Sequence, residues 1–507
     1  MKYERIKNTK RNLISASAFK VVSLVMPVII RAIIIRSLGA EYVGISGLFS
    51  SILTVLSISE LGFGSAIVFS MYEPIARDDF IKVGALLNFY KKIYKWVTLI
   101  IVTGGIVSSF FLQYLIKGEY PQELNIYYLF ILYLINTASS YMFGAYKASL
   151  LTAYQRDDVI SKCSLASQII VYATEVIILV FFRNYYGYVI VMSLGNVILN
   201  LSISRYVDNN YPNIRIQGEI TGKERGEIIN KVKGLLANRI LSVSRTSSDT
   251  IFITSFCGLL SNAIYSNYFL VVTSINSLMF LLAASITGGI GNGLIVYDED
   301  KNYNDFMSID IIFMAVCSIW IIGMFNFYDI FISTLFGSQY ILGQVEKMLF
   351  CSLFFVISTG NIKGIYLNAA GLWDKTKKYA IMDAICNALL NLIGVLLFGI
   401  SGVVSATIIT LLVFDSYIYT KVLFDEVLTE HRLVSFWKLN AFFALSIVFV
   451  LQAGRVVSCF CENEYLVAIL SFVFEIVAFG MIILVTSRYN KYFKDSFRLV
   501  NSLIRLR

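Results

Sequence analysis

Long apolar stretches alternate with short polar gaps along the whole chain. Each stretch has about the 20 residues that a helix needs to cross the hydrocarbon core of a bilayer. Helices or a closed barrel are the only structures that satisfy backbone groups there, and these stretches lack the alternation of barrel strands. The pattern predicts fourteen membrane-spanning helices, at residues 12–38, 43–71, 95–116, 124–146, 159–182, 186–205, 235–256, 262–297, 306–328, 345–371, 379–399, 402–422, 434–454 and 465–487.

The basic residues lie mainly in every second gap between these stretches. The intervening gaps hold only Lys117, Arg183 and Arg455. Short loops rich in Lys and Arg stay on the cytoplasmic side, so we expect both termini inside the cell. The outer gaps are short, and the longest is about 329–344. We therefore expect a multi-pass protein without an extracellular domain.

Composition agrees with a membrane protein. Hydrophobic residues make up 57% of the chain and charged residues 15%, and the mean hydropathy is +0.72, which is outside the soluble range. The net charge is +9, and the basic residues behind it border the spans, where they face anionic membrane lipid. We therefore expect no nucleic-acid partner. The seven Cys have no metal-ligand spacing. We expect neither a metal nor a cofactor.

The chain contains an internal repeat with an offset of about 220 residues. Segment 143–148 precedes a similar segment at 363–368, and both end the fourth helix of a half. Six helices return the chain to its starting side, so two such halves have parallel orientation. The predicted fold is an all-α polytopic membrane protein with about 14 helices, in which two six-helix lobes precede two C-terminal helices. The expected parts are residues 1–205 (first lobe), 206–234 (cytoplasmic linker), 235–422 (second lobe) and 423–507 (helices 13 and 14 with a basic tail).

Charged residues inside the spans are expensive at bilayer depth unless they face protein or water. The basic candidates for a substrate cavity between the lobes are Lys20, Arg31, Arg239, Arg245 and Lys363. An excess of positive charge concentrates anions, and Arg matches phosphate oxygens bidentately. Arg245 has a structural alternative, because Asp249 lies four residues on, at the spacing of a helix-surface ion pair. Arg36, near the outer end of its helix, is expected to extend to the interface.

Acidic and helix-breaking residues complete the candidate set. Three carboxylates in the spans are candidates for ion coupling: Glu60, Asp249 and Glu175. The candidate hinges are Pro27, Gly62, Gly64, Gly289 and Gly291. Close helix packing explains the four glycines equally well.

Four segments near the N-terminus resemble a known family: residues 38–49, 60–67, 72–79 and 90–92, which include Glu60-Leu61-Gly62-Phe63-Gly64. They are similar to the Wzx-type polysaccharide flippases of the multidrug/oligosaccharidyl-lipid/polysaccharide exporter superfamily. The resemblance implies a bacterial inner (plasma) membrane protein that moves undecaprenyl-diphosphate-linked oligosaccharide units to the outer leaflet by alternating access. It also implies a role in O-antigen or capsule synthesis, with a polymerase and other assembly proteins as partners.

Other functions stay open on the residues alone. A lipid II flippase shares the span number and the cationic cavity, and a multidrug or cation antiporter has the same fold with carboxylates in place of cations. A membrane glycosyltransferase or polymerase is a weaker alternative. The turn Asp298-Glu299-Asp300 has a metal-nucleotide-sugar pattern, but it is an isolated tripeptide, and the only histidine, His431, has no catalytic partner in the sequence. We expect a transporter and not an enzyme.

Overall fold

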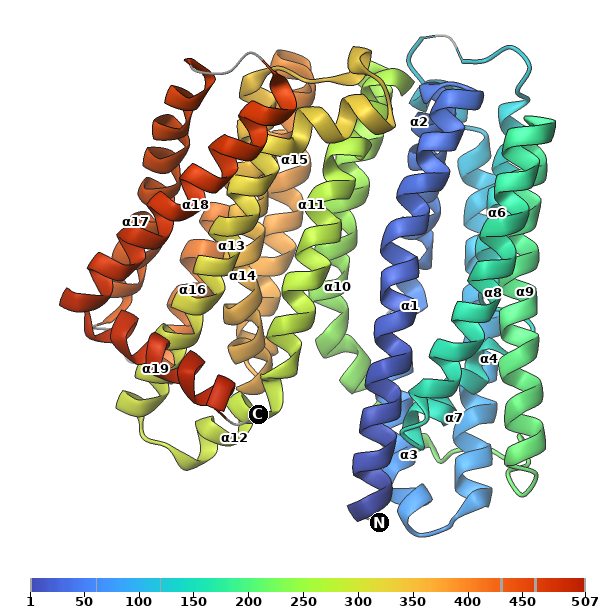
Figure 1. Cartoon of the computed structure of the whole chain (residues 1–507). Helices are drawn as coiled ribbons and strands as arrows, with labels where there is room; N and C mark the ends of the chain where they lie inside the picture. Colours follow the sequence, from blue (N-terminus) through green and yellow to red (C-terminus); the bar gives the residue numbers. More distant parts are fainter. Residues whose placement is uncertain (1, 61, 119, 429–431, 460–462, 506–507) are drawn as a thin grey trace. The chain divides into compact units, whose positions relative to one another are not determined.

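The computed structural model describes residues 2–60, 62–118, 120–428, 432–459 and 463–505. Within these ranges the secondary structure consists of helices and contains no strand. Each of the fourteen predicted stretches lies on helical segments, which confirms the all-α polytopic class. The chain packs into two compact units, Met1–Ser266 (unit 1) and Asn267–Arg507 (unit 2) (Figure 1).

Nine of the described helices are long and apolar enough to cross a membrane. One of the nine, Asp374–Leu428, contains two predicted spans, and Ala40–Leu56 and Ile126–Ser139 are apolar but shorter. The other predicted spans lie on helical segments outside these two groups.

Unit 1 consists of helices, and helices far apart in the sequence pack on one another. Its elements are α1 (Lys2–Ser37), α2 (Ala40–Leu56), η1 (Ser57–Glu60), α3 (Phe63–Ala76), α4 (Phe80–Ser109), α5 (Leu112–Leu115), α6 (Ile126–Ser139), η2 (Ala145–Lys147), α7 (Ala148–Ala153), α8 (Asp157–Ile177), η3 (Ile178–Phe182), α9 (Tyr185–Asn210), α10 (Gly222–Cys257) and the first residues of α11 (Leu259–Ser285). Helix α1 lies along α8, while α9 packs on both α6 and α8 (Figure 1).

Helix α2 makes a close contact with the start of α11. A Cβ at Gly44 would lie 2.2 Å from the Leu259 carbonyl oxygen, so only glycine allows this approach. The Asn262 side-chain amide donates a 2.8 Å hydrogen bond to the Gly44 carbonyl oxygen. Helix α10 also packs against α2 and α3. As a result α10 belongs to unit 1, and the unit boundary lies later in the chain than the expected linker at 206–234.

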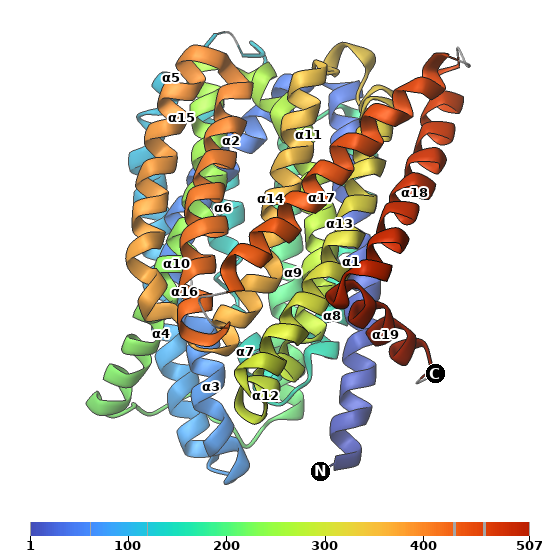
Figure 2. The ribbon, with the colours of Figure 1, turned by 90° about the vertical axis from the view of Figure 1, so that its left-hand side faces the viewer.

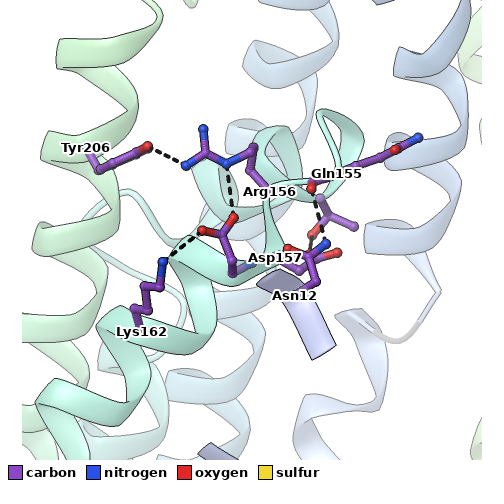
Figure 3. Close-up of polar contacts among 8 residues, drawn as sticks. Asn12, Gln155, Arg156, Asp157, Lys162 and Tyr206 are labelled. Carbon is purple, nitrogen blue, oxygen red and sulfur yellow. Dashed lines mark hydrogen bonds and ion pairs between the residues drawn. The ribbon is translucent and has the colours of Figure 1, made fainter. Parts of the chain in front are cut away.

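A polar network joins α1 to the start of α8 (Figure 3). Its centre is Asp158, whose carboxylate pairs with Arg156 at 3.0 Å and with Lys162 at 3.2 Å. The Asn12 side chain accepts from the Asp158 backbone N–H at 2.9 Å and donates to the Gln155 carbonyl oxygen at 3.2 Å. Asn12 is the first residue of the first predicted span and Asp158 immediately precedes the fifth, so the network holds the ends of these two helices together.

The irregular segment 211–221 between α9 and α10 is attached to α4. A Cβ at Gly84 would lie 2.0 Å from the Arg215 carbonyl oxygen, so the segment runs directly over the α4 backbone. The Asn88 side-chain amide donates to the Gly218 carbonyl oxygen at 2.8 Å.

Two ion pairs extend this attachment. Lys92 of α4 pairs with Glu219 at 2.7 Å, and Lys82 pairs with Glu224 in the first turn of α10. Thr221 and Glu224 form a capping box that starts α10. The expected linker 206–234 is therefore partly helical at both ends, and its middle is held by α4.

Unit 2 contains the rest of α11 and the elements that follow: α12 (Thr287–Val296), α13 (Glu299–Leu335), η4 (Ser338–Tyr340), α14 (Gln344–Ala369), α15 (Trp373–Thr410), η5 (Leu411–Tyr419), α16 (Thr420–Leu423), η6 (Phe424–Leu428), α17 (Leu433–Gly454), η8 (Arg455–Cys459), α18 (Glu464–Tyr489) and α19 (Lys491–Arg505). Helix α13 packs against α14, α17, α18 and α19. Beyond α18 the chain changes direction into α19 (Figure 2).

Within α15 the chain reverses at Gly399, whose φ of 58° and ψ of −131° are not helical. A Cβ at Gly402 would lie 1.9 Å from the Gly394 carbonyl oxygen, so the two arms meet backbone to backbone. Only glycine adopts this conformation and approach readily. The predicted spans 379–399 and 402–422 are these two arms, the second of which continues into η5 and α16.

The candidate hinges differ in their backbone. Gly62 is left-handed, with φ 107° and ψ −24°, and separates η1 from α3. Helix α1 continues through Pro27 without interruption. Gly289 and Gly291 lie inside α12, and the break in the eighth predicted span comes earlier, at Ile286 between α11 and α12. The expected hinge movement stays a prediction.

Candidate functional site

The motif Glu60-Leu61-Gly62-Phe63-Gly64 interrupts the second predicted span and places a carboxylate at the break. Helix α2 ends at Leu56, a 3-10 turn ends at Glu60, and the left-handed Gly62 starts α3. The structure does not describe Leu61. At such a break, a side chain can point in a direction that a continuous helix does not allow.

Two tyrosines of α4, four residues apart, meet this carboxylate. The Tyr90 hydroxyl donates to Glu60 Oε1 at 3.2 Å and lies 3.2 Å from the Tyr94 hydroxyl oxygen. The two rings pack edge to face with centroids 4.6 Å apart, and Tyr94 packs in the same way on Tyr141. A Cβ at Gly64 would lie 2.9 Å from the Tyr90 hydroxyl oxygen, so glycine leaves room for it.

A pocket of about 520 Å³ adjoins this cluster. We call it the tyrosine pocket, and its walls come from α3, α4 and the η2–α7 segment. It is lined by Gly64, Ser65, Val68, Phe69, Tyr72, Tyr90, Tyr94, Ala145, Ala148, Ser149 and Thr152. Tyrosine provides an apolar ring and a polar hydroxyl together. The pocket therefore suits a ligand with both hydroxyl groups and apolar faces.

A second cluster surrounds Arg31 of α1. Arg31 is partly buried and interacts electrostatically with Tyr188, Tyr185 and Tyr133. The Tyr185 hydroxyl donates to the Tyr42 carbonyl oxygen at 3.1 Å and therefore accepts from the Tyr133 hydroxyl, 2.9 Å away. The predicted cation thus lies among hydroxyl groups of α6 and α9.

Lys363 of α14 has a carboxylate neighbour that the sequence analysis did not assign to it. It is 1% exposed, and its ammonium lies 3.1 Å from Asp415 Oδ2 and 3.2 Å from the Asp415 carbonyl oxygen. Asp415 belongs to the π-helix η5, and π-helical turns are frequent at functional sites. The charge of Lys363 is compensated inside unit 2 by this carboxylate. Its predicted role in substrate binding is untested.

The remaining predicted residues lie on helices of unit 1. Lys20 of α1 and Arg245 of α10 are partly buried, and the side chain of Arg239 lies outside the described part of the chain. Asp249 is 2% exposed and accepts a 2.9 Å hydrogen bond from the Tyr265 hydroxyl. Glu175 of α8 is equally buried. The assignment of these residues to one substrate cavity stays a prediction.

No family model and no curated protein matches the sequence. Solved structures match it over most of its length. The lipid II flippase MurJ in an inward closed conformation aligns with a TM-score of 0.65 and 16% identity, over 94% of this chain and 99% of the MurJ chain. An inward-facing multidrug resistance MATE family transporter of the MOP superfamily aligns with a TM-score of 0.63 and 13% identity, over 82% and 99%. The chain has the fold that these two transporters share.

Proposed function

We propose that this protein is a flippase that moves undecaprenyl-diphosphate-linked oligosaccharides across a bacterial plasma membrane by alternating access. The observation that carries the proposal is the alignment with MurJ over almost the whole length of both chains. MurJ is described as a lipid II flippase, so its substrate is also a glycan on a lipid carrier. The resemblance of residues 60–67 to Wzx-type flippases favours an O-antigen or capsule unit as the cargo.

The two clusters of unit 1 fit the two chemical parts of such a substrate. A diphosphate needs a cation, and Arg31 supplies one among the hydroxyl groups of Tyr133, Tyr185 and Tyr188. A sugar needs hydroxyl partners and apolar faces, and the tyrosine pocket has both. In this proposal the protein binds and releases its cargo without a covalent step.

Lipid II transport is the second candidate, because MurJ is a lipid II flippase. An experiment that separates the two candidates uses the purified chain in proteoliposomes with two fluorescent substrates, lipid II and an undecaprenyl-diphosphate-linked capsule or O-antigen unit. We expect faster movement of the capsule or O-antigen unit. Preference for lipid II would favour the second candidate, and movement of neither substrate would contradict the proposal.

The same assay tests Arg31. We expect Arg31→Gln to abolish movement of the diphosphate substrate, because Arg31 supplies the positive charge among the hydroxyl groups of Tyr133, Tyr185 and Tyr188. Arg36→Gln is the matched control, since Arg36 lies on the same helix and is exposed. Equal activity of both variants in correctly inserted protein would remove Arg31 from the proposed site.

A further inference from the structure

The hydroxyl groups that line the tyrosine pocket donate their hydrogens mainly to the protein itself. Six side chains of the lining carry a hydroxyl group: Ser65, Tyr72, Tyr90, Tyr94, Ser149 and Thr152. Ser65 and Tyr72 are exposed. Each of the other four has a hydrogen-bond acceptor inside the protein, so its hydrogen is already used. This direction decides which groups of a ligand the pocket can bind.

On the α4 side, Glu60 sets the direction of a chain of two hydrogen bonds. An ionised carboxylate only accepts, so the Tyr90 hydroxyl donates to Glu60 Oε1 at 3.2 Å. A hydroxyl group has a single hydrogen. The Tyr94 hydroxyl, 3.2 Å from that of Tyr90, therefore donates to Tyr90. The lone pairs of the Tyr94 oxygen are left for a ligand.

The η2–α7 side of the pocket has the same property. The Ser149 hydroxyl donates to the Tyr146 carbonyl oxygen at 2.7 Å, and the Thr152 hydroxyl donates to Asp157 Oδ1 at 2.7 Å. Turning either hydroxyl toward a ligand would break its bond inside the protein. Both walls of the pocket thus offer hydrogen-bond acceptors to a ligand.

The charges around the pocket agree with this direction. Among the described residues, no Lys or Arg lines it, and the Glu60 carboxylate contacts Tyr90 at its wall. Lys231 lies 4.3 Å from the centroid of the Phe69 ring, but it lines a separate pocket in which carboxylates outnumber cations. A negatively charged ligand group would therefore find few donors and a carboxylate nearby.

We propose that the tyrosine pocket selects a sugar that carries hydroxyl or amino groups and rejects an acidic sugar such as a uronic acid. A sugar hydroxyl or ammonium group donates to the oxygens of Tyr94, Ser149 and Thr152. A sugar carboxylate has only acceptors, and Glu60 repels it. The inference rests on the proposed function and names the class of sugar in the cargo.

The experiment measures movement across proteoliposomes of three undecaprenyl-diphosphate-linked sugars that differ only at C6. One is a hexose, one is the corresponding hexuronic acid, and one is the 6-amino-6-deoxyhexose. All three keep the diphosphate for Arg31. We expect the full-length protein to move the hexose at least about tenfold faster than the uronic acid, because a site built from acceptors leaves an acidic group unpaired. The amino sugar should move at least as fast as the hexose.

Glu60→Gln tests the origin of this selectivity. Its amide can accept from Tyr90 or donate to it, so the variant is expected to fold and the chain of hydroxyls can reverse. We expect the hexose-to-uronate ratio to fall towards one. Glu73→Gln is the matched control, since it removes the same charge from an exposed residue of α3 that does not line the tyrosine pocket, and it should keep the ratio.

Thr152→Val is a second variant, for use if Glu60→Gln does not fold. It removes one acceptor and should slow the hexose more than the uronic acid. Movement of none of the three sugars would contradict the proposed function. Equal movement of hexose and uronic acid by the wild type, or faster movement of the uronic acid, would overturn the selectivity alone. An unchanged ratio in both variants would also overturn it.

Discussion

Replacing Lys363 with Met tests the most buried ion pair that the structure describes in unit 2. The Lys363 ammonium contacts Asp415 at 3.1 Å and also interacts electrostatically with Asp310, which is 1% exposed. The positive charge of Lys363 therefore stabilises two carboxylates. Lys363→Met keeps most of the apolar side chain but removes this shared charge.

The expected cost follows from what each substitution leaves behind. Removing one partner of a buried pair costs about 3–5 kcal/mol, because the other charge stays buried and uncompensated. Lys363→Met leaves two carboxylates and should lie in that range. Asp415→Asn leaves Lys363 with Asp310 and with the Asp415 carbonyl contact, now from Asn, so we expect a smaller loss of about 1–2 kcal/mol. The double variant should cost less than the sum, because its two changes remove opposite charges in contact.

The assay is reversible unfolding of the purified variants in mixed micelles, followed by circular dichroism against a rising fraction of denaturing detergent. The order of the two single variants is the decisive result. If Asp415→Asn lowers the free energy of unfolding more than Lys363→Met does, or if the two losses add in the double variant, then Lys363 does not stabilise both carboxylates. If Lys363→Met is as stable as wild type but inactive in transport, its predicted role in substrate binding gains support over a structural role.

Two further predictions concern unit 1 and use the same unfolding assay. Gly44→Ala places a methyl group 2.2 Å from the Leu259 carbonyl oxygen and should lower the free energy of unfolding by about 1–3 kcal/mol. The control Gly226→Ala, whose Cβ would have nothing within 4 Å, should raise it by about 0.4–1 kcal/mol. An unchanged stability of Gly44→Ala would mean that α2 and α11 are not in backbone contact. Tyr90→Phe removes the 3.2 Å hydrogen bond to Glu60 and should cost about 1–3 kcal/mol as well as slow glycan transport, and unchanged stability and transport would show that this hydrogen bond has no role.

The sequence predicts the positions of the helices because hydrophobic length is a local property. Gly62 was one of the candidate hinges, and the helix is interrupted there, since glycine enters the left-handed region at little cost. The break at Ile286 was not predicted, although Gly289 lies only three residues further on. Glycines inside α12 fit a continuous helix once packing supports it, so their presence does not locate the break.

Side-chain partners were the part that local patterns did not reveal. Tyr90 lies 30 residues from Glu60, and Asp415 lies 52 residues from Lys363. Such contacts depend on how the helices pack. The spacing of Tyr90 and Tyr94, four residues apart, does indicate that both lie on one face of α4. It was the one available sign of the tyrosine pocket.

The attachment of segment 211–221 to α4 has a mechanical consequence. Arg215 and Gly218 lie against α4, and Glu219 and Glu224 pair with lysines of α4. Most of the connecting segment is therefore held in place by α4. A loose tether would let α10 move while α4 stays still. Here a displacement of α10 has to move α4 as well or first break these contacts. The connecting segment therefore couples the two helices mechanically.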